Sequence, residues 1–201
     1  MIYNTEKLDN IYKASDLLLK GDIIVYPTDT LYGFGVDATN TKAISRLNHL
    51  KNRKRPYSII VNSIDMLKEY AILDDNLKVQ ISSILPGAVT IILNKLINDL
   101  SPLVTLDLNT VGIRIPNSNF ILQVVQKINR PIITTSINVH GEEALNDIKL
   151  INKKYPNINI FQNDVIKDSK GSTIIDFSNK PFKILRQGDA EINLWIIILK
   201  F

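Results

Sequence analysis

The sequence predicts an α/β protein built around a mixed sheet. Short β-branched segments alternate with segments of helical periodicity along most of the chain, and several strand-like segments then follow one another towards the C-terminus. Alternation of this kind is typical of an α/β sheet, and the later gathering of strands adds antiparallel pairs. The 201 residues contain no internal repeat and no linker rich in Gly, Ser or Pro. We therefore expect one domain over residues 1–201.

Helices are predicted where apolar residues recur every three or four positions. The first covers residues 8–19 and is followed by Gly21, a residue suited to a C-terminal stop. The second begins at Thr41, a good N-cap residue, and brings Lys51 and Arg53 to its C-terminal end. Further helices are expected around residues 64–71, 75–84, after an N-cap at Asn117 up to Ile128, and over 142–154.

Strands are predicted at short β-branched segments bounded by proline or glycine. Pro27 and Pro116 each end such a segment, because proline has no amide hydrogen for a ladder. The predicted strands are residues 22–26, 57–61, 88–93, 110–115 and 131–135, followed by segments around 158–161, 172–177, 182–186 and 193–199. Polar, hydroxyl-bearing residues follow several of these strands.

The composition excludes several kinds of chemistry. There is no cysteine, so disulfides, cysteine-based zinc sites and cysteine nucleophiles are excluded, and only two histidines are present. Chemistry must therefore use hydroxyls, carboxylates, amines and guanidiniums. We find no acidic cluster with ligand spacing, and expect no protein-held metal; any Mg²⁺ would arrive with nucleotide phosphates. The net charge of +4 fits anionic ligands such as ATP, a weak affinity for nucleic acid, or neither.

No segment has the features of a secretory signal or a membrane span. The first ten residues carry acidic side chains and no apolar core, and the longest apolar run, residues 195–199, is far too short to cross a bilayer. We expect a soluble, cytoplasmic protein.

Two segments in the first third of the chain can bind anions. Residues 27–35 follow a strand with hydroxyls and two glycines, which allow a ligand to approach the backbone closely, although an ordinary turn explains the same residues. Residues 51–55 carry four cations, suited to phosphate or carboxylate. A solvated helix end and a short nucleic-acid patch are the alternatives for the second segment.

Polar groups also stand at apolar strand ends further along the chain. Thr134, Ser136 and Asn138 share one side of an extended segment and need partners if buried, although Asn138 could instead cap a helix. Arg114 lies between apolar neighbours, where an unpaired guanidinium would be costly, so a partner is expected. Arg186 stands similarly at a strand end. Neither standard glycine-rich phosphate loop is present.

Taken in order, these segments resemble one family. The chain reads YPTDTLYGFGVDA, KNR, PGAVTIIL, VGIRIP, TTSINVHGE, STIID and ILRQG. This series is similar to the YrdC-like threonylcarbamoyl-AMP synthase family from about Asp22 to Gly188, nearly the whole chain. The most specific parts are the K-x-R pair Lys51/Arg53 and the S-x-N pair Ser136/Asn138. The chain resembles the short, single-domain form of the family.

The resemblance implies a fold and an activity. The fold would be a twisted, open mixed sheet flanked by helices, with a concave, positively charged face. The enzyme would convert L-threonine, bicarbonate or CO₂, and ATP into threonylcarbamoyl-AMP and pyrophosphate. A separate transferase would use the product to modify adenosine 37 of tRNA, and tRNA itself would bind weakly if at all.

The resemblance also implies roles for single residues. Lys51 and Arg53 would be catalytic, neutralising charge at the α-phosphate and on the leaving pyrophosphate. The ATP-binding residues would be Lys51, Arg53, Thr110, Ser136, Asn138 and Arg186. The L-threonine-binding residues would be Thr30, Asn62, Arg114, Thr134 and Ser172.

Some positions depart from the family pattern, and other functions remain open. Asn62 stands where many members have histidine, Leu85 replaces a frequent tryptophan, and the alignment of residues 54–58 is ambiguous. A paralogue with a different carbamoyl acceptor is one alternative. A non-catalytic RNA-binding module is another, although such a module would interleave aromatic residues with its cations, and Tyr57 is the only aromatic residue near residues 51–55.

Overall fold

The computed structural model describes residues 1–52, 55–97, 99–139, 142–163 and 168–193. Within these ranges the chain forms the following helices: α1 (Leu8–Leu19), α2 (Thr41–Lys51), α3 (Ile64–Tyr70), α4 (Asp75–Ser82), α5 (Pro102–Thr105), α6 (Asn119–Ile128) and α7 (Ile148–Lys154). The strands are β1 (Ile2–Asn4), β2 (Ile24–Tyr26), β3 (Gly33–Gly35), β4 (Ser58–Ile60), β5 (Val89–Asn94), β6 (Thr110–Arg114), β7 (Ile132–Ser136), β8 (Asn159–Gln162), β9 (Thr173–Asp176) and β10 (Lys183–Arg186).

The strands of the described chain form one mixed sheet in the order β1-β8-β2-β3-β7-β4-β6-β5-β9-β10. Parallel pairs join β1 to β8, β2 to β8, β4 to β6 and β5 to β9, whereas the other neighbours are antiparallel. The mixed sheet predicted from the sequence is confirmed.

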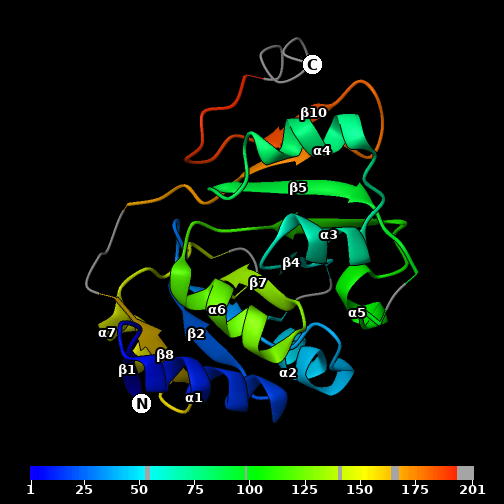
Figure 1. Cartoon of the computed structure of the whole chain (residues 1–201). Helices are drawn as coiled ribbons and strands as arrows, with labels where there is room; N and C mark the ends of the chain where they lie inside the picture. Colours follow the sequence, from blue (N-terminus) through cyan, green and yellow to red (C-terminus); the bar gives the residue numbers. More distant parts are fainter. Residues whose placement is uncertain (53–54, 98, 140–141, 164–167, 194–201) are drawn as a thin grey trace.

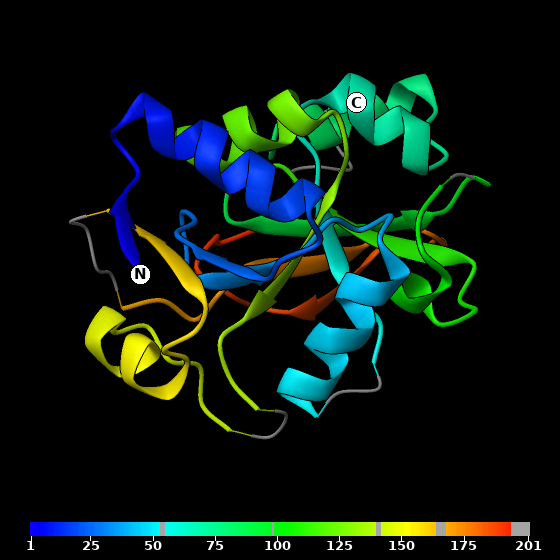
Figure 2. The ribbon, with the colours of Figure 1, turned by 90° about the horizontal axis from the view of Figure 1, so that it is seen from below.

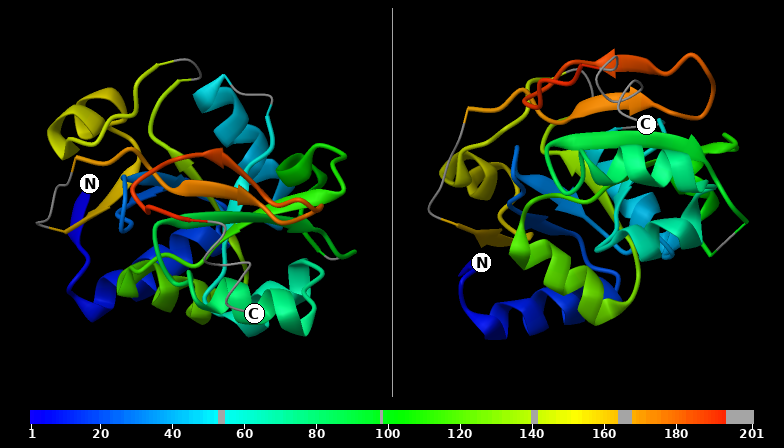
Figure 3. Two further views of the ribbon diagram at one scale, coloured as in Figure 1. Left: turned by 90° about the horizontal axis from the view of Figure 1, so that it is seen from above. Right: turned by 45° about the horizontal axis from the view of Figure 1, so that its top comes forward.

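Helices lie on both faces of this sheet (Figures 1 and 2). One face carries α1 and α6, which pack together, with α3 and α4 beside them, and the opposite face carries α2 and α7. In the view from above, α2 and α7 lie on the same side of the sheet but apart from each other (Figure 3, left). The polar strand ends described below open on the face of α2 and α7.

The core follows the apolar patterns of the sequence. All five apolar residues predicted for one side of α6 are buried, namely Phe120, Ile121, Val124, Val125 and Ile128. In β4, Ile59 and Ile60 are fully buried between the helical layers. Burying apolar surface in this way contributes roughly 25 cal/mol per Å² to stability. No helix of the described residues is long and apolar enough to cross a membrane.

Three local predictions were wrong. The N-cap of α2 is Asn40, whose side-chain oxygen accepts from the amide of Ala43 at 3.0 Å, and not Thr41. The N-cap of α6 is Ser118 and not Asn117. The predicted helix over 142–154 begins only at Ile148, because Asp147 caps it by accepting from the amide of Leu150.

Some elements were not predicted, and one prediction lies outside the described residues. Strand β3 is part of the segment 27–35 that the sequence presented as a loop, and it pairs with both β2 and β7. Strand β1 and the short helix α5 were also missed. The predicted strand at 193–199 falls almost wholly within residues 194–201, which the structure does not describe.

Candidate active site

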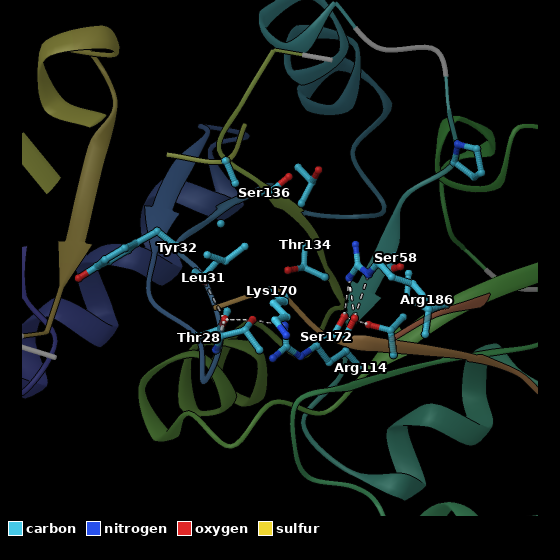
Figure 4. Close-up of a pocket in the computed structure, with 18 residues that line it drawn as sticks. Thr28, Leu31, Tyr32, Ser58, Arg114, Thr134, Ser136, Lys170, Ser172 and Arg186 are labelled. Atoms are coloured by element: carbon cyan, nitrogen blue, oxygen red, sulfur yellow. Dashed lines mark hydrogen bonds between the residues drawn. The ribbon is translucent and has the colours of Figure 1, made fainter. Parts of the chain in front are cut away.

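A cavity of about 310 Å³ lies among the polar strand ends (Figure 4). Its lining comes from the 27–35 segment, from β4, β5, β6, β7, β9 and β10, and from connections between them, which are far apart in sequence. The polar side chains on its wall include Thr28, Thr30, Tyr32, Ser58, Thr90, Arg114, Thr134, Thr135, Ser136, Lys170, Ser172 and Arg186. Among these described lining residues there are three cations and no carboxylate. The cavity is therefore suited to an anion with hydroxyl or amine groups.

Arg114 is the most buried cation of the cavity, with 5% of its surface exposed. It stands at the end of β6, pairs with the carboxylate of Asp29, and donates to the hydroxyl of Thr30 at 3.0 Å. The partner expected from the sequence is thus a carboxylate of the chain itself. Burial lowers the pKa of Arg114, and the charge of Asp29 opposes that shift. Its buried Nε has no hydrogen-bond partner among the described residues.

The loop between β2 and β3 is an ordered turn that also faces the cavity. The hydroxyl of Thr28 donates to the carbonyl of Leu31 at 2.8 Å and accepts from the amide of Thr30 at 3.1 Å. These bonds are those of a hydroxyl-stabilised turn. The segment is therefore both an ordinary turn and a part of the candidate site, because the turn directs Thr30 to Arg114.

Arg186 and Ser172 join the β9 and β10 side of the cavity. The Nε and Nη2 atoms of Arg186 donate to the carbonyl of Ser172 at 3.1 and 2.7 Å, and Nη2 also lies 3.2 Å from the Ser172 hydroxyl. That hydroxyl lies 2.7 Å from the hydroxyl of Thr90. Burial, and then the charge of Arg114, lower the pKa of Arg186. The two guanidiniums therefore share one electrostatic environment.

Lys51 meets the S-x-N segment at the end of β7. Its ammonium donates to the carbonyls of Ser136 and Asn138 at 2.5 and 2.7 Å and to the side-chain oxygen of Asn138 at 2.9 Å. Lys51 is 1% exposed, so it is not part of a solvated helix end. The amide of Asn138 donates to the carbonyl of Glu142, and Asn138 does not cap α7.

The predicted site residues divide into groups by position. Thr30, Arg114, Thr134, Ser136, Ser172 and Arg186 line the cavity, while Lys51 and Asn138 adjoin it through Ser136. Thr110 and Asn62 are not among its lining residues. Thr110 begins β6, at the opposite end of that strand from Arg114. Arg53 lies outside the described residues.

Sequence reasoning missed several residues of the cavity. Ser58 pairs in register with Thr134 across β4 and β7, so strand pairing would have placed it on the same wall. Asp29, which pairs with Arg114 from outside the cavity lining, was overlooked within a segment that the sequence already singled out. Lys170 stands in a connection with no helical or strand pattern, and no signal indicated it.

The described residues offer no protein-held metal site. No group of three or more His, Cys, Asp or Glu side chains among them is placed to hold a metal ion. This arrangement agrees with the absence of carboxylates from the described lining.

A mixed α/β sheet with a cavity of cations and hydroxyls on one face defines an α/β protein with a candidate anion-binding site. The chain belongs to the Sua5/YciO/YrdC family, because the model of that family, described as telomere recombination, matches residues 16–188. The resemblance inferred from the motifs is thereby confirmed.

Relatives and a solved structure extend this comparison. A protein of Methanocaldococcus jannaschii provisionally named threonylcarbamoyl-AMP synthase is 34% identical over 177 residues, covering 85% of this chain and 82% of that protein. The threonylcarbamoyl-AMP synthase of Aliivibrio fischeri is 30% identical over 190 residues, covering 90% of this chain and all of that protein. The crystal structure of P. abyssi Sua5 complexed with L-threonine superposes with a TM-score of 0.89 at 25% identity. It is matched over 98% of this chain but only 61% of the Sua5 chain.

Proposed function

We propose that this protein is a threonylcarbamoyl-AMP synthase, which forms threonylcarbamoyl-AMP and pyrophosphate from L-threonine, bicarbonate or CO₂, and ATP. The observation that carries the proposal is that Arg114, Lys170 and Arg186 line one cavity together with the hydroxyls of several strand ends. The relatives from Methanocaldococcus jannaschii and Aliivibrio fischeri are both named for this activity.

The cavity has partners for both substrates. For L-threonine we propose Thr30, Arg114, Thr134 and Ser172, because a carboxylate and a hydroxyl need guanidinium and hydroxyl partners. Asn62 is proposed with this group on the family pattern alone. For ATP we propose Ser136 and Arg186 of the cavity together with Lys51 and Asn138 beside it, and Arg53 and Thr110 on the family pattern alone. The carboxylate of Asp29 already pairs with Arg114, so a bound amino acid would use the remaining donor atoms of that guanidinium.

The reaction needs little covalent chemistry from the protein. The amine of threonine adds to the carbon of CO₂ and loses a proton, giving a carbamate. A carbamate oxygen then attacks the α-phosphorus, and the bond from that phosphorus to the oxygen bridging the β-phosphate breaks. Nearby cations favour the neutral, nucleophilic amine and stabilise the charge on pyrophosphate as it leaves. Positioning and electrostatics therefore dominate, in agreement with the absence of cysteine.

Lys51 has a particular place in this scheme. The three donor hydrogens of its ammonium match three oxygens of Ser136 and Asn138. To donate directly to a phosphate, Lys51 would replace one of these three hydrogen bonds with a bond to the phosphate. We propose that Lys51 holds the S-x-N segment in place and adds positive charge beside the phosphates, with Arg53 as the second catalytic cation.

Other features of the protein follow as proposals from the same activity. Mg²⁺ would enter as part of the MgATP substrate, because the described residues offer no cage of their own. We propose one domain over residues 1–201, a concave basic face around the cavity, a cytoplasmic location, transfer of the product to a separate threonylcarbamoyl transferase, and at most weak direct binding of tRNA.

Release of pyrophosphate tests the proposal. Purified protein with MgATP and bicarbonate should release pyrophosphate only when L-threonine is added, and Arg186→Ala should reduce the rate by at least about tenfold, as for loss of a charged contact. Folded wild-type protein that gives no threonine-dependent release would contradict the proposed function.

A further inference from the structure

Lys170 lies on the cavity wall, outside every motif that indicated the site (Figure 4). We propose that Lys170 is a further substrate-binding residue, whose ammonium contacts an oxyanion of the substrate bound beside Arg114 and Arg186, and that Asp189 positions it. The inference rests on the proposed function and adds to it a residue from the connection before β9.

Asp189 holds the turn that carries Lys170. Its carboxylate accepts from the amide of Lys170 at 2.7 Å and from the hydroxyl of Ser169. In return, the amide of Asp189 donates to the carbonyl of Gly171 at 2.9 Å. Ser169 closes the turn by accepting from the amide of Gly171 at 2.9 Å. The backbone around Lys170 is thus fixed by reciprocal bonds, while its side chain is exposed.

Two glycines allow this close contact between the segment before β9 and the segment after β10. Gly171 has φ of +82°, in the left-handed region that favours glycine. A Cβ at Gly188 would lie 2.2 Å from the carbonyl oxygen of Gly171. The turn is therefore built by specific residues on both segments, and it brings Lys170 to the same wall as Ser172 and Arg186.

The charged groups around the cavity favour binding of an anion beside Lys170. Asp29 offsets the charge of Arg114, and the carboxylate of Asp189 acts on both Arg114 and Arg186, while Arg186 is itself bonded to the uncharged carbonyl and hydroxyl of Ser172. Two carboxylates therefore face the three cations Arg114, Lys170 and Arg186, and the site keeps a net positive charge. Among the described residues, none forms an ion pair with Lys170. Three cations on one small cavity repel one another, and an oxyanion between them removes that repulsion. The flexible stem of Lys170 allows its ammonium to follow such a ligand.

The substrates supply two oxyanions of this kind. One is the carboxylate and carbamate of N-carboxythreonine, which carries two negative charges, and the other is the phosphate chain of ATP. Lys170 stands two residues from Ser172, a proposed threonine ligand, which favours the amino-acid side. The shared chemistry is an ammonium bound to an oxyanion, and separate binding measurements distinguish the two sources.

Calorimetric titration of the full chain tests the inference. L-threonine with bicarbonate and a non-hydrolysable ATP analogue are titrated separately into wild type, Lys170→Ala and Lys170→Arg. Lys170→Ala should weaken binding of at least one ligand about five- to thirtyfold, as for a charge-assisted contact, and Lys170→Arg should retain most of it. Lys183→Ala, which removes an exposed lysine of β10 outside the cavity lining, is the matched control.

The outcomes separate the inference from the function it rests on. Weaker binding of threonine alone assigns the contact to the amino acid, and weaker binding of the ATP analogue alone assigns it to phosphate. Wild-type protein that binds both ligands while Lys170→Ala binds them equally well overturns the inference and leaves the proposed function intact. Wild-type protein that binds neither contradicts both.

The role of Asp189 is tested by a double-mutant cycle. Asp189→Ala should weaken binding in the wild-type background and have much less effect in Lys170→Ala, because both changes remove the same contact. Lys170→Ala keeps the backbone amide that bonds Asp189, so the turn survives in that variant. Equal effects of Asp189→Ala in both backgrounds would show that Asp189 does not act through Lys170.

Discussion

The carboxylate of Asp29 joins the turn after β2 to the end of β6 by pairing with the guanidinium of Arg114 and accepting from the amide of Asn117 at 2.9 Å. Asp29 belongs to the turn after β2, whereas Arg114 ends β6 and Asn117 follows it. One side chain therefore fixes both the turn that bears Thr30 and the orientation of the buried cation. Asp29 is a positioning residue for the proposed threonine end of the site.

Asp29→Asn should weaken this arrangement, because an amide keeps hydrogen-bonding capacity but loses the charge that compensates Arg114. We expect a loss of about 2–3 kcal/mol in the free energy of unfolding and a KM for L-threonine raised more than the KM for ATP. Urea unfolding and steady-state kinetics measure these effects. Asp22→Asn, at an exposed position, is the control. A variant with wild-type stability and threonine KM would remove Asp29 from this role.

Lys51→Met should destabilise the protein as well as reduce its activity. Methionine retains much of the buried stem, but the oxygens of Ser136 and Asn138 lose their donor. We expect a cost of about 2–4 kcal/mol in the free energy of unfolding, measured by denaturant titration. Lys42→Met, on the exposed side of the same helix, should cost less than about 0.5 kcal/mol. Equal stability of the two variants would show that Lys51 does not hold the S-x-N segment.

Gly188→Ala should be more damaging than Gly112→Ala, although both glycines lie in tight surroundings. The added Cβ at Gly188 meets backbone atoms of Gly171 and Ser172, the nearest at 2.2 Å, whereas at Gly112 it meets the hydroxyl of Ser58 at 2.6 Å. Backbone cannot move aside as a serine side chain can. We expect losses of about 2–4 and 1–2 kcal/mol in the free energy of unfolding. Ser58→Gly should restore part of the second loss and none of the first; the reverse result would contradict this account.

The Glu142–Lys154 ion pair predicts that the stability of the protein depends slightly on pH. The hydrogen bond from Lys154 lowers the pKa of Glu142 below its usual value. A carboxyl with a depressed folded-state pKa contributes stability that is present above its unfolded pKa of about 4.3 and lost as pH falls through the folded value. Titration of Glu142 by NMR should show a higher pKa in Lys154→Met than in wild type. An identical pKa would mean that the pair does not form in solution.

Local sequence patterns predicted the elements whose formation depends on their own residues. Helix α6 carries a complete apolar face, and its five predicted core residues are all buried. Strand β3 was missed because GFG has no β-branched residue, and its extended form depends on pairing with β2 and β7. The start of α7 was misplaced because the cap at Asp147 outweighs the helical pattern before it.

The site was predictable in its chemistry but not in its pairings. Burial of Arg114 between apolar neighbours indicated that a partner must exist, yet nothing local identifies Asp29, which lies 85 residues away. The burial of Lys51 likewise depends on a strand end far along the chain. Lys170 and Asp189 come together only because β9 and β10 pair. Long-range pairing is therefore the part of this site that the sequence does not reveal.

Incorporation of labelled bicarbonate tests the central claim most directly, because simple adenylation of threonine would also release pyrophosphate. Wild-type protein is incubated with MgATP, L-threonine and ¹⁴C-bicarbonate, and the nucleotide product is isolated. The proposed function predicts label in an AMP adduct in a 1:1 ratio to pyrophosphate, and strong loss of both in Arg186→Ala. Threonine-dependent release of pyrophosphate without label in the nucleotide product would contradict the claim.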